Sequence, residues 1–310
     1  MSRIHEALKK AAEERTAQTA NQAVSDLMEL SSPARAAETL PANGGTHLSS
    51  DIHTRVEPEI LTFEGFAKCC KPVTWRIEPT GSVFSAEMDH QMGAEKFRTL
   101  RSRLYQVASA QPLKKLLITS STPAEGKTFV AANLAQSFIR QTNRKVLLID
   151  SDLRASRLHL HFGAPEEPGL SDYLSGDCNE FQVTQLGTDG NLCLIPGGRE
   201  VSNPSELLHS DRMKKLLERM STIFDWIILD SPPALAVHDA SILADMCDGV
   251  LFVVRAGATD FQLAEKASSE FHEKNLLGVV LNRVEKSDAY GDYYYHGYGS
   301  QTTAETEADS

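Results

Sequence analysis

A short loop between an apolar run and a helical segment carries the residues best suited to chemistry. Residues 121–128 read Ser-Thr-Pro-Ala-Glu-Gly-Lys-Thr, which matches the phosphate-binding pattern GxxxxGK[ST] except that serine replaces the first glycine. In such a loop, backbone N–H groups cradle phosphate oxygens and the start of the next helix adds positive potential. Lys127 is expected to neutralise phosphate charge, and Thr128 to offer a hydroxyl to Mg²⁺. The predicted nucleotide-binding residues are Ser121, Thr122, Pro123, Ala124, Glu125, Gly126, Lys127, Thr128 and Phe129.

Two acidic motifs stand at the ends of other apolar runs. The run Val146-Leu-Leu-Ile leads into Asp150 and Asp152, and the run Trp226-Ile-Ile-Leu leads into Asp230. In an open α/β sheet, ligands gather at the carboxyl ends of the strands. Carboxylates there can hold Mg²⁺ through water, and one can accept a proton from an incoming hydroxyl. A single aspartate could be a helix N-cap, but that explanation is insufficient for three of them beside a phosphate-binding loop.

A dense group of tyrosines lies near the C-terminus. Five of the seven tyrosines fall within residues 290–298, flanked by glycine and aspartate. A core strand would bury aromatics at alternate positions, whereas three in a row put rings on both faces. We interpret the segment as a solvated tail of phenolic acceptors; an adhesive, stacking or disordered segment is the alternative. The predicted acceptors are Tyr290, Tyr293, Tyr294, Tyr295 and Tyr298.

The elements that must position these residues alternate between apolar runs and helical patterns. Short continuous strands separated by helices predict a parallel sheet covered on both faces, so the expected fold is α/β and doubly wound. The N-terminal residues 4–11 form an amphipathic pattern that is either a frayed stub or a docking helix, and residues 31–60 have the composition of a linker. The expected strands are 116–119, 146–149, 192–195, 226–229, 250–254 and 279–281, with helices near 93–108, 131–138, 205–220, 238–246 and 260–273.

The composition excludes several classes of function. The formal charge of −11 argues against a nucleic-acid partner, and no apolar run is long enough to span a membrane. The N-terminus has no apolar core of a secretory signal. The five cysteines show no CxxC spacing, so neither a disulfide framework nor a zinc site is predicted. The expected location is therefore cytoplasmic.

Together these residues resemble the bacterial tyrosine kinase family associated with capsule and exopolysaccharide assembly, over about residues 85–298. The resemblance implies ATP and Mg²⁺ as cofactors, with Asp152 and Asp230 acting around the metal and Asp150 orienting or deprotonating the attacking tyrosine. It also implies that Asn282 lies near the adenine, although Asn282 could equally cap a strand-end turn. The motifs that carry it are Ser120–Thr128, Ile149–Arg154, Gly169–Gly176, Pro196–Gly198, Asn203–Leu208, Ile228–Pro233 and the tyrosine cluster.

One helix in the resemblance concerns assembly. Glu95, Arg98 and Arg101 match the ExxRxxR helix, which in that family mediates ring-like self-association. These residues fall three apart, so we expect them to lie along one helical face. Without the resemblance, such a charged stripe would be interpreted as a solvated face.

The resemblance implies an ATP-dependent protein tyrosine autokinase that phosphorylates the tyrosine cluster in trans and regulates capsule or exopolysaccharide polymerisation and export. The implied fold is a P-loop NTPase like MinD and ParA. The expected parts are an N-terminal helix and flexible linker (1–80), a kinase domain (81–285) and a flexible tyrosine-rich tail (286–310). The implied partners are further copies of the chain, an activating membrane-embedded polysaccharide co-polymerase that recruits it to the inner face of the cell membrane, and a cognate tyrosine phosphatase.

The chain departs from the family pattern at Ala124, where glycine is usual. Alanine disfavours a positive φ, and we expect that this position does not need one, so that the loop is unstrained. Two other functions remain as alternatives. A partitioning or septum-positioning ATPase shares the fold but usually carries an extra lysine early in the loop, where Thr122 and Pro123 stand here. An inactive scaffold would keep the fold without the chemistry.

Overall fold

The computed structural model describes residues 62–77, 81–84 and 91–284. The expected N-terminal helix, the linker and the tyrosine cluster lie outside the described residues.

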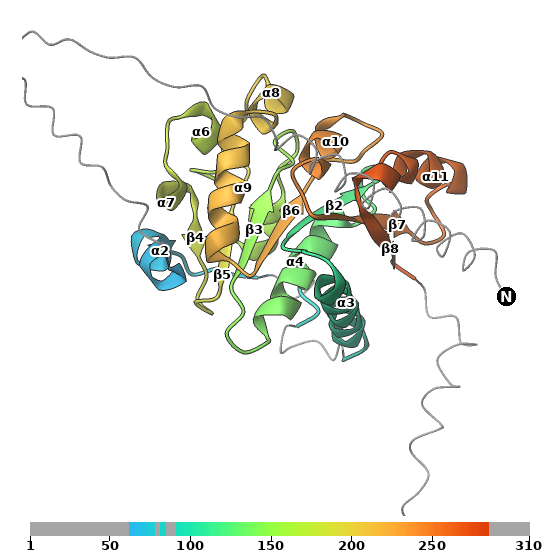
Figure 1. The fold of residues 1–310 in the computed structure, drawn as a ribbon, viewed down its shortest axis with the longest axis horizontal. Helices are drawn as coiled ribbons and strands as arrows, with labels where there is room; N and C mark the ends of the chain where they lie inside the picture. Colours follow the sequence, from blue (N-terminus) through green and yellow to red (C-terminus); the bar gives the residue numbers. More distant parts are fainter. Residues whose placement is uncertain (1–61, 78–80, 85–90, 285–310) are drawn as a thin grey trace, which may run out of the picture. The chain divides into compact units, whose positions relative to one another are not determined.

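The described residues form a mostly parallel eight-stranded sheet with helices on both faces, which confirms the predicted α/β class (Figure 1). Every neighbouring pair is parallel except β4 and β5, which are antiparallel. The central strands β3, β5 and β6 are continuous apolar runs because each is buried on both faces. In sheet order the strands are β1 (Lys71–Pro72), β4 (Gln185–Leu186), β5 (Leu192–Ile195), β3 (Val146–Asp150), β6 (Trp226–Asp230), β2 (Lys115–Ser120), β7 (Gly249–Arg255) and β8 (Leu276–Asn282).

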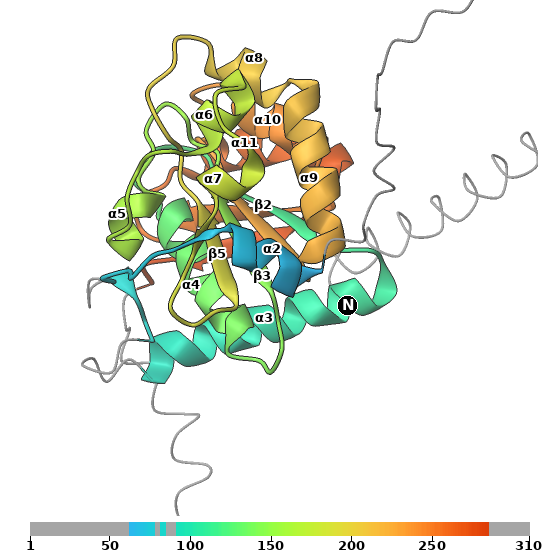
Figure 2. The same cartoon turned by 90° about the vertical axis from the view of Figure 1, so that its left-hand side faces the viewer.

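The helices divide between two hydrophobic clusters, one on each face of the sheet (Figures 1 and 2). One face is covered by α3 (Gln91–Ala110), α4 (Lys127–Ile139) and α5 (Leu158–Phe162). The other is covered by α2 (Phe63–Cys69), α6 (Leu170–Ser175), α7 (Glu180–Val183), α8 (Pro204–Leu208), α9 (Asp211–Ile223), α10 (Asp239–Ala244) and α11 (Phe261–Ser269), the last followed by the 3₁₀ turn η2 (His272–Lys274).

The helix that follows the glycine-bearing loop is the most deeply placed. In α4, every residue from Val130 to Phe138 is buried. The Phe138 ring stacks on Trp226 at the start of β6, with ring centroids 4.2 Å apart. Because α4 packs all round rather than along one stripe, its first residues are held in a fixed position relative to β2 and β6.

The predicted elements agree with the structure to within a few residues at their ends. The helix expected near 205–220 is two helices. The first, α8, ends at Leu208 with His209 as its C-cap, and Ser210 caps the N-terminus of α9 by accepting a hydrogen bond from Met213 N. The sequence did not reveal α2, α5, α6 or α7, which have seven, five, six and four residues and are too short to show a helical period. In the part of the chain that the structure describes, no helix is both long and apolar enough to cross a bilayer.

Helix α2 lies within residues 1–80, which we expected to precede the kinase domain. It packs against the helices that cover one face of the sheet. Phe66 is completely buried, and its ring lies 5.7 Å from that of Phe224 and 5.3 Å from that of Phe181. Phe63 meets Phe224 edge-on at 5.5 Å. These contacts make α2 part of the same folded core as α7 and the end of α9.

We expect Phe66→Ala to lower the free energy of unfolding by about 3–5 kcal/mol, because it removes a fully buried ring and leaves a cavity. Urea unfolding followed by circular dichroism measures this directly. Lys68→Ala is the matched control, since Lys68 is an exposed residue of the same helix and its loss should change stability by less than about 0.5 kcal/mol. Equal, small effects of both substitutions would contradict the packing of α2 described above.

Candidate nucleotide-binding site

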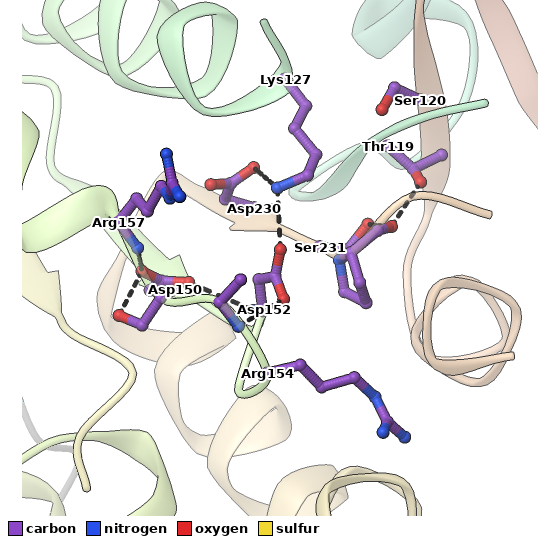
Figure 3. Close-up of polar contacts among 12 residues, drawn as sticks. Thr119, Ser120, Lys127, Asp150, Asp152, Arg154, Arg157, Asp230 and Ser231 are labelled. Carbon is purple, nitrogen blue, oxygen red and sulfur yellow. Dashed lines mark hydrogen bonds and ion pairs between the residues drawn. The ribbon is translucent and has the colours of Figure 1, made fainter. Parts of the chain in front are cut away.

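The three chemical motifs meet at one edge of the sheet (Figure 3). Asp150 and Asp230 end the neighbouring strands β3 and β6, where they are direct register partners. Residues 121–126 leave the end of β2, which pairs with the other side of β6, and lead into α4 at Lys127. The expected meeting of the loop and the three aspartates at the carboxyl ends of the strands is therefore observed.

Lys127 contacts two of the carboxylates. Its Nζ lies 2.9 Å from Asp152 Oδ2 and 4.0 Å from Asp230 Oδ1, and the lysine side chain is largely buried. Burial lowers the pKa of Lys127, but the charges of Asp230 and Asp152 outweigh it and hold the pKa above its usual value. Lys127 is therefore a permanent cation at the point where phosphate charge would be neutralised.

Asp230 has spare bonding capacity. Its carboxylate is buried, and within the described residues its Oδ1 atom has no hydrogen-bond partner. Burial raises the pKa of Asp230 to about 7, while Lys127 and a hydrogen bond from Thr128 act in the opposite direction. A buried oxygen without a hydrogen bond, beside a hydroxyl and a second carboxylate, fits a divalent cation or its water, so Asp152, Asp230 and Thr128 could hold such an ion.

A metal here would need other ligands as well. Within residues 62–77, 81–84 and 91–284, no group of three or more His, Cys, Asp or Glu side chains has metal-site geometry. Mg²⁺ commonly takes one or two protein carboxylates and completes its shell with phosphate oxygens and water. The donor set is therefore typical of a cation that binds together with a nucleotide.

Asp150 is held differently from the other two aspartates. It is fully buried, and its Oδ2 atom accepts hydrogen bonds from Ser156 Oγ (2.8 Å), Leu158 N (2.9 Å) and Arg157 N (3.1 Å). Its Oδ1 atom accepts one from Asp152 N at 3.1 Å. Burial raises the pKa of Asp150, against the effect of these hydrogen bonds. Its position is fixed by the turn that follows β3, and Oδ1 is its less engaged oxygen.

The phosphate-binding loop is pinned by a carboxylate of its own. Glu125 is almost fully buried and accepts hydrogen bonds from Ser121 Oγ (2.9 Å) and Thr122 N (2.7 Å). Thr259, in the connection between β7 and α11, also donates its hydroxyl to Glu125. The Glu125 side chain therefore closes the loop on itself instead of facing a phosphate. Sequence reasoning missed Thr259, which no motif marks.

Asn282 lies beside the same loop. Its Nδ2 donates to the backbone oxygen of Glu125 at 2.9 Å. Gly126 has φ of 97°, and a Cβ there would collide with the Asn282 amide, so this position requires glycine. The contact of Asn282 with adenine stays a prediction. The hydrogen bond to Glu125 places Asn282 against the phosphate-binding loop.

The expectation for Ala124 is wrong. Ala124 has φ of 66°, in the left-handed region. An L-residue with a Cβ is disfavoured there by about 1 kcal/mol, so the loop carries the strain that we expected to be absent. The conformation follows from loop closure, because residues on both sides of Ala124 are fixed by the hydrogen bonds of Glu125 to Ser121 and Thr122.

The remaining predicted site residues lie further from the carboxylates. Pro123 is exposed at the tip of the loop. Phe129 packs between Phe97 and His161, with ring centroids 6.1 and 6.3 Å away. Phe129 therefore connects the first turn of α4 to α3 and α5.

The three predicted interface residues of helix α3 differ in their contacts. Glu95 and Arg98 form an exposed ion pair. Arg101 instead donates to the backbone oxygen of Ser137 in α4. Self-association through this helix stays a prediction, but Arg101 also has a role within the chain.

The fold and this arrangement of loop and aspartates define a P-loop nucleotide-binding domain. A family model described as the CobQ/CobB/MinD/ParA nucleotide binding domain matches residues 116–294, which is more than half of the chain. The tyrosine-protein kinase YwqD of Bacillus subtilis is 36% identical over 70% of this chain and 91% of its own length. The chain belongs to the family of bacterial tyrosine-protein kinases.

Two further comparisons agree. The kinase domain of the Escherichia coli tyrosine kinase ETK is similar with a TM-score of 0.58 and 36% identity, covering 64% of this chain and 80% of that one. The tyrosine-protein kinase wzc of Salmonella typhimurium is 36% identical over 68% of this chain. The matched region makes up only 30% of the length of wzc. These relatives confirm the resemblance and favour a kinase over a partitioning ATPase.

We expect Ala124→Gly to raise the free energy of unfolding by about 0.5–1 kcal/mol, because relief of the left-handed strain exceeds the extra chain entropy of glycine. Urea unfolding gives the value. Ala264→Gly in α11 is the control, since a glycine within a helix should destabilise by about 1 kcal/mol. Destabilisation by both substitutions would show that Ala124 is not strained.

We expect affinity for ADP in the presence of Mg²⁺ to fall as the pH is lowered below about 7. With its pKa raised to about 7, Asp230 binds a proton at lower pH, and the cation must displace that proton. The limiting slope is about tenfold per pH unit. Titration with fluorescent ADP measures it, and Asp230→Asn gives the background pH dependence of the nucleotide itself. The same slope in both proteins would rule out Asp230 as the titrating group.

Proposed function

We propose that this chain is an ATP-dependent protein tyrosine kinase that phosphorylates its own C-terminal tyrosine cluster in trans. The observation that carries the proposal is the contact of Lys127 with Asp152 and Asp230 at the end of the phosphate-binding loop. Membership of the tyrosine kinase family supports the choice of tyrosine as the acceptor.

The site residues divide the work of phosphoryl transfer. Bound ATP with Mg²⁺ supplies the phosphoryl group and the cation that neutralises its developing charge. Lys127 binds the phosphate oxygens, and Thr128, Asp152 and Asp230 hold the cation. Asp150 orients the acceptor hydroxyl or takes its proton. Tyrosine has a reference pKa of about 10, so it needs a carboxylate or a metal field to react near neutral pH.

The geometry of the last strand supports the tail as acceptor. Asn282 at the end of β8 contacts the phosphate-binding loop, so the chain leaves the domain next to the site. Tyr290 follows eight residues later (290 minus 282). Eight extended residues span about 26 Å, so Tyr290 lies within about that distance of Asn282.

The wider role is proposed from the resemblance. Copies of the chain associate through α3, a membrane-embedded polysaccharide co-polymerase recruits and activates them, and a tyrosine phosphatase reverses the modification. Each phosphate adds about −1.5 to −2 charge to an already acidic tail, which favours dissociation of packed copies. Such a cycle would regulate capsule or exopolysaccharide polymerisation and export.

Mixing two inactive variants tests the function and its direction together. Lys127→Met keeps the tail but loses the phosphate-binding cation. The variant with Tyr290, Tyr293, Tyr294, Tyr295 and Tyr298 all changed to Phe keeps the site but loses the acceptors. We expect neither alone to accumulate phosphotyrosine with ATP and Mg²⁺, while the mixture phosphorylates the Lys127→Met tail.

Mass spectrometry of that mixture locates the phosphate. A main site at Tyr105 or Tyr173 would overturn the tail as acceptor. Wild-type protein that binds ATP but yields no phosphotyrosine would favour an inactive scaffold.

We expect Asp150→Asn to slow phosphoryl transfer by about 100-fold or more while ADP affinity stays within about threefold, because the lost group handles the acceptor proton. Single-turnover phosphorylation and ADP titration measure the two effects separately. Collapse of nucleotide affinity would instead assign Asp150 to the metal site and exchange its role with that of Asp152.

A further inference from the structure

Arg154 belongs to the same turn as Asp152 but points away from Lys127 (Figure 3). Its Nε donates to Asp239 Oδ2 at 2.8 Å and its Nη2 to Asp239 Oδ1 at 3.4 Å. The same Nη2 donates to Ser205 Oγ at 2.9 Å. Arg154 therefore connects the turn after β3 to the first residue of α10 and to α8.

Asp239 is the buried centre of these contacts. It is completely inaccessible to solvent, and Ser205 Oγ donates to its Oδ1 at 2.6 Å. The three side chains thus form a closed network in which each contacts the other two. A buried carboxylate is tolerated only when it is paired and hydrogen-bonded. Asp239 therefore needs Arg154 and Ser205, and in turn it holds both side chains in place.

The turn that this network anchors contains the carboxylate that contacts Lys127. Asp152 Oδ2 contacts Lys127, and Asp152 Oδ1 accepts from Ala155 N at 3.1 Å. Arg154 is one of the two residues between the ends of that hydrogen-bonded turn. Fixing its side chain limits how far the turn can rotate, and with it the direction of the Asp152 carboxylate.

The network is also connected to the segment that carries Asp230, the other candidate metal ligand. Asp230 ends β6, and residues 231–238 run from it to Asp239 at the start of α10. That segment is tied to β2 by hydrogen bonds from Thr119 Oγ1 to Pro232 O and from Ser231 Oγ to Ile118 O, both 3.0 Å long. Arg154 and Asp239 therefore join the two segments that carry Asp152 and Asp230 on the side away from Lys127.

We propose that Arg154, Ser205 and Asp239 are positioning residues that set the spacing of the Asp152 and Asp230 carboxylates for a divalent cation bound with a nucleotide. The inference rests on the proposed function for the identity of that cation, Mg²⁺. The three side chains contact one another, and they act through the turn after β3 and through the segment 231–238. A purely structural role would stabilise α8 and α10 without affecting cation binding.

The test compares ADP affinity in Mg²⁺ with ADP affinity in EDTA for the full chain. Arg154→Lys keeps the charge but loses the two-pronged contact with Asp239. We expect it to reduce the enhancement of ADP affinity by Mg²⁺ by about tenfold, the scale for residues that orient metal ligands. Affinity in EDTA should change by less than about twofold, because Lys127 and the loop are untouched.

Arg144→Lys is the matched control. Arg144 pairs with Asp225 and is as exposed as Arg154, with 43% against 40% of the side chain accessible. Both residues of that pair precede strands β3 and β6, at the end of the sheet away from the site. This substitution should leave both affinities unchanged.

Ser205→Ala provides the second variant, because it removes one hydroxyl and no charge. We expect a loss of Mg²⁺ enhancement of about threefold, and this variant decides the matter if Arg154→Lys does not fold. An unchanged Mg²⁺ enhancement in folded variants, or equal losses in Mg²⁺ and EDTA, would overturn the proposal. Because the readout is binding, absence of kinase activity in the wild type would be a separate result.

Discussion

The site depends on the electrostatic balance between the positive charge of Lys127 and the negative charges of three carboxylates at the carboxyl ends of β3 and β6. Lys127 contacts Asp152 and Asp230, and the charge of Asp150 lies close enough to raise the pKa of the lysine further. Burial raises the pKa of Asp230 to about 7, and the charge of Lys127 acts against that rise. Lys127 therefore offsets part of the negative charge that these carboxylates place where phosphate and metal must bind.

The rest of the fold serves to keep these charges in place. Burial of α4 from Val130 to Phe138 fixes the position of Lys127 at its start, and the register of β3 with β6 sets Asp150 beside Asp230. The loop between β2 and α4 is closed by Glu125 and by contacts from the distant Thr259 and Asn282. These hydrogen bonds also offset the strain of Ala124 in the left-handed region, which explains how alanine is tolerated at this position.

The sequence predicted those features that local patterns determine. Apolar runs revealed the core strands, and the aspartates that follow two of them predicted the meeting point, because parallel strands share a carboxyl edge. The φ of Ala124 could not be predicted, since it follows from the side-chain contacts of Glu125. Arg101 forms a hydrogen bond to Ser137 in α4, 36 residues away in sequence. The partner of Arg154, Asp239, lies 85 residues away. Such long-range pairings leave no periodic signal in a single sequence.

Divalent-cation binding in the absence of nucleotide tests the central balance most directly. If Lys127 offsets the charge of Asp152 and Asp230, wild-type protein should bind Mn²⁺ weakly, and Lys127→Met should bind it at least about tenfold more tightly, because a unit charge within a few ångströms is removed. Electron paramagnetic resonance of free Mn²⁺ gives both affinities, with Arg144→Met as a control for loss of positive charge elsewhere. Equal Mn²⁺ affinity in wild type and Lys127→Met would contradict the account.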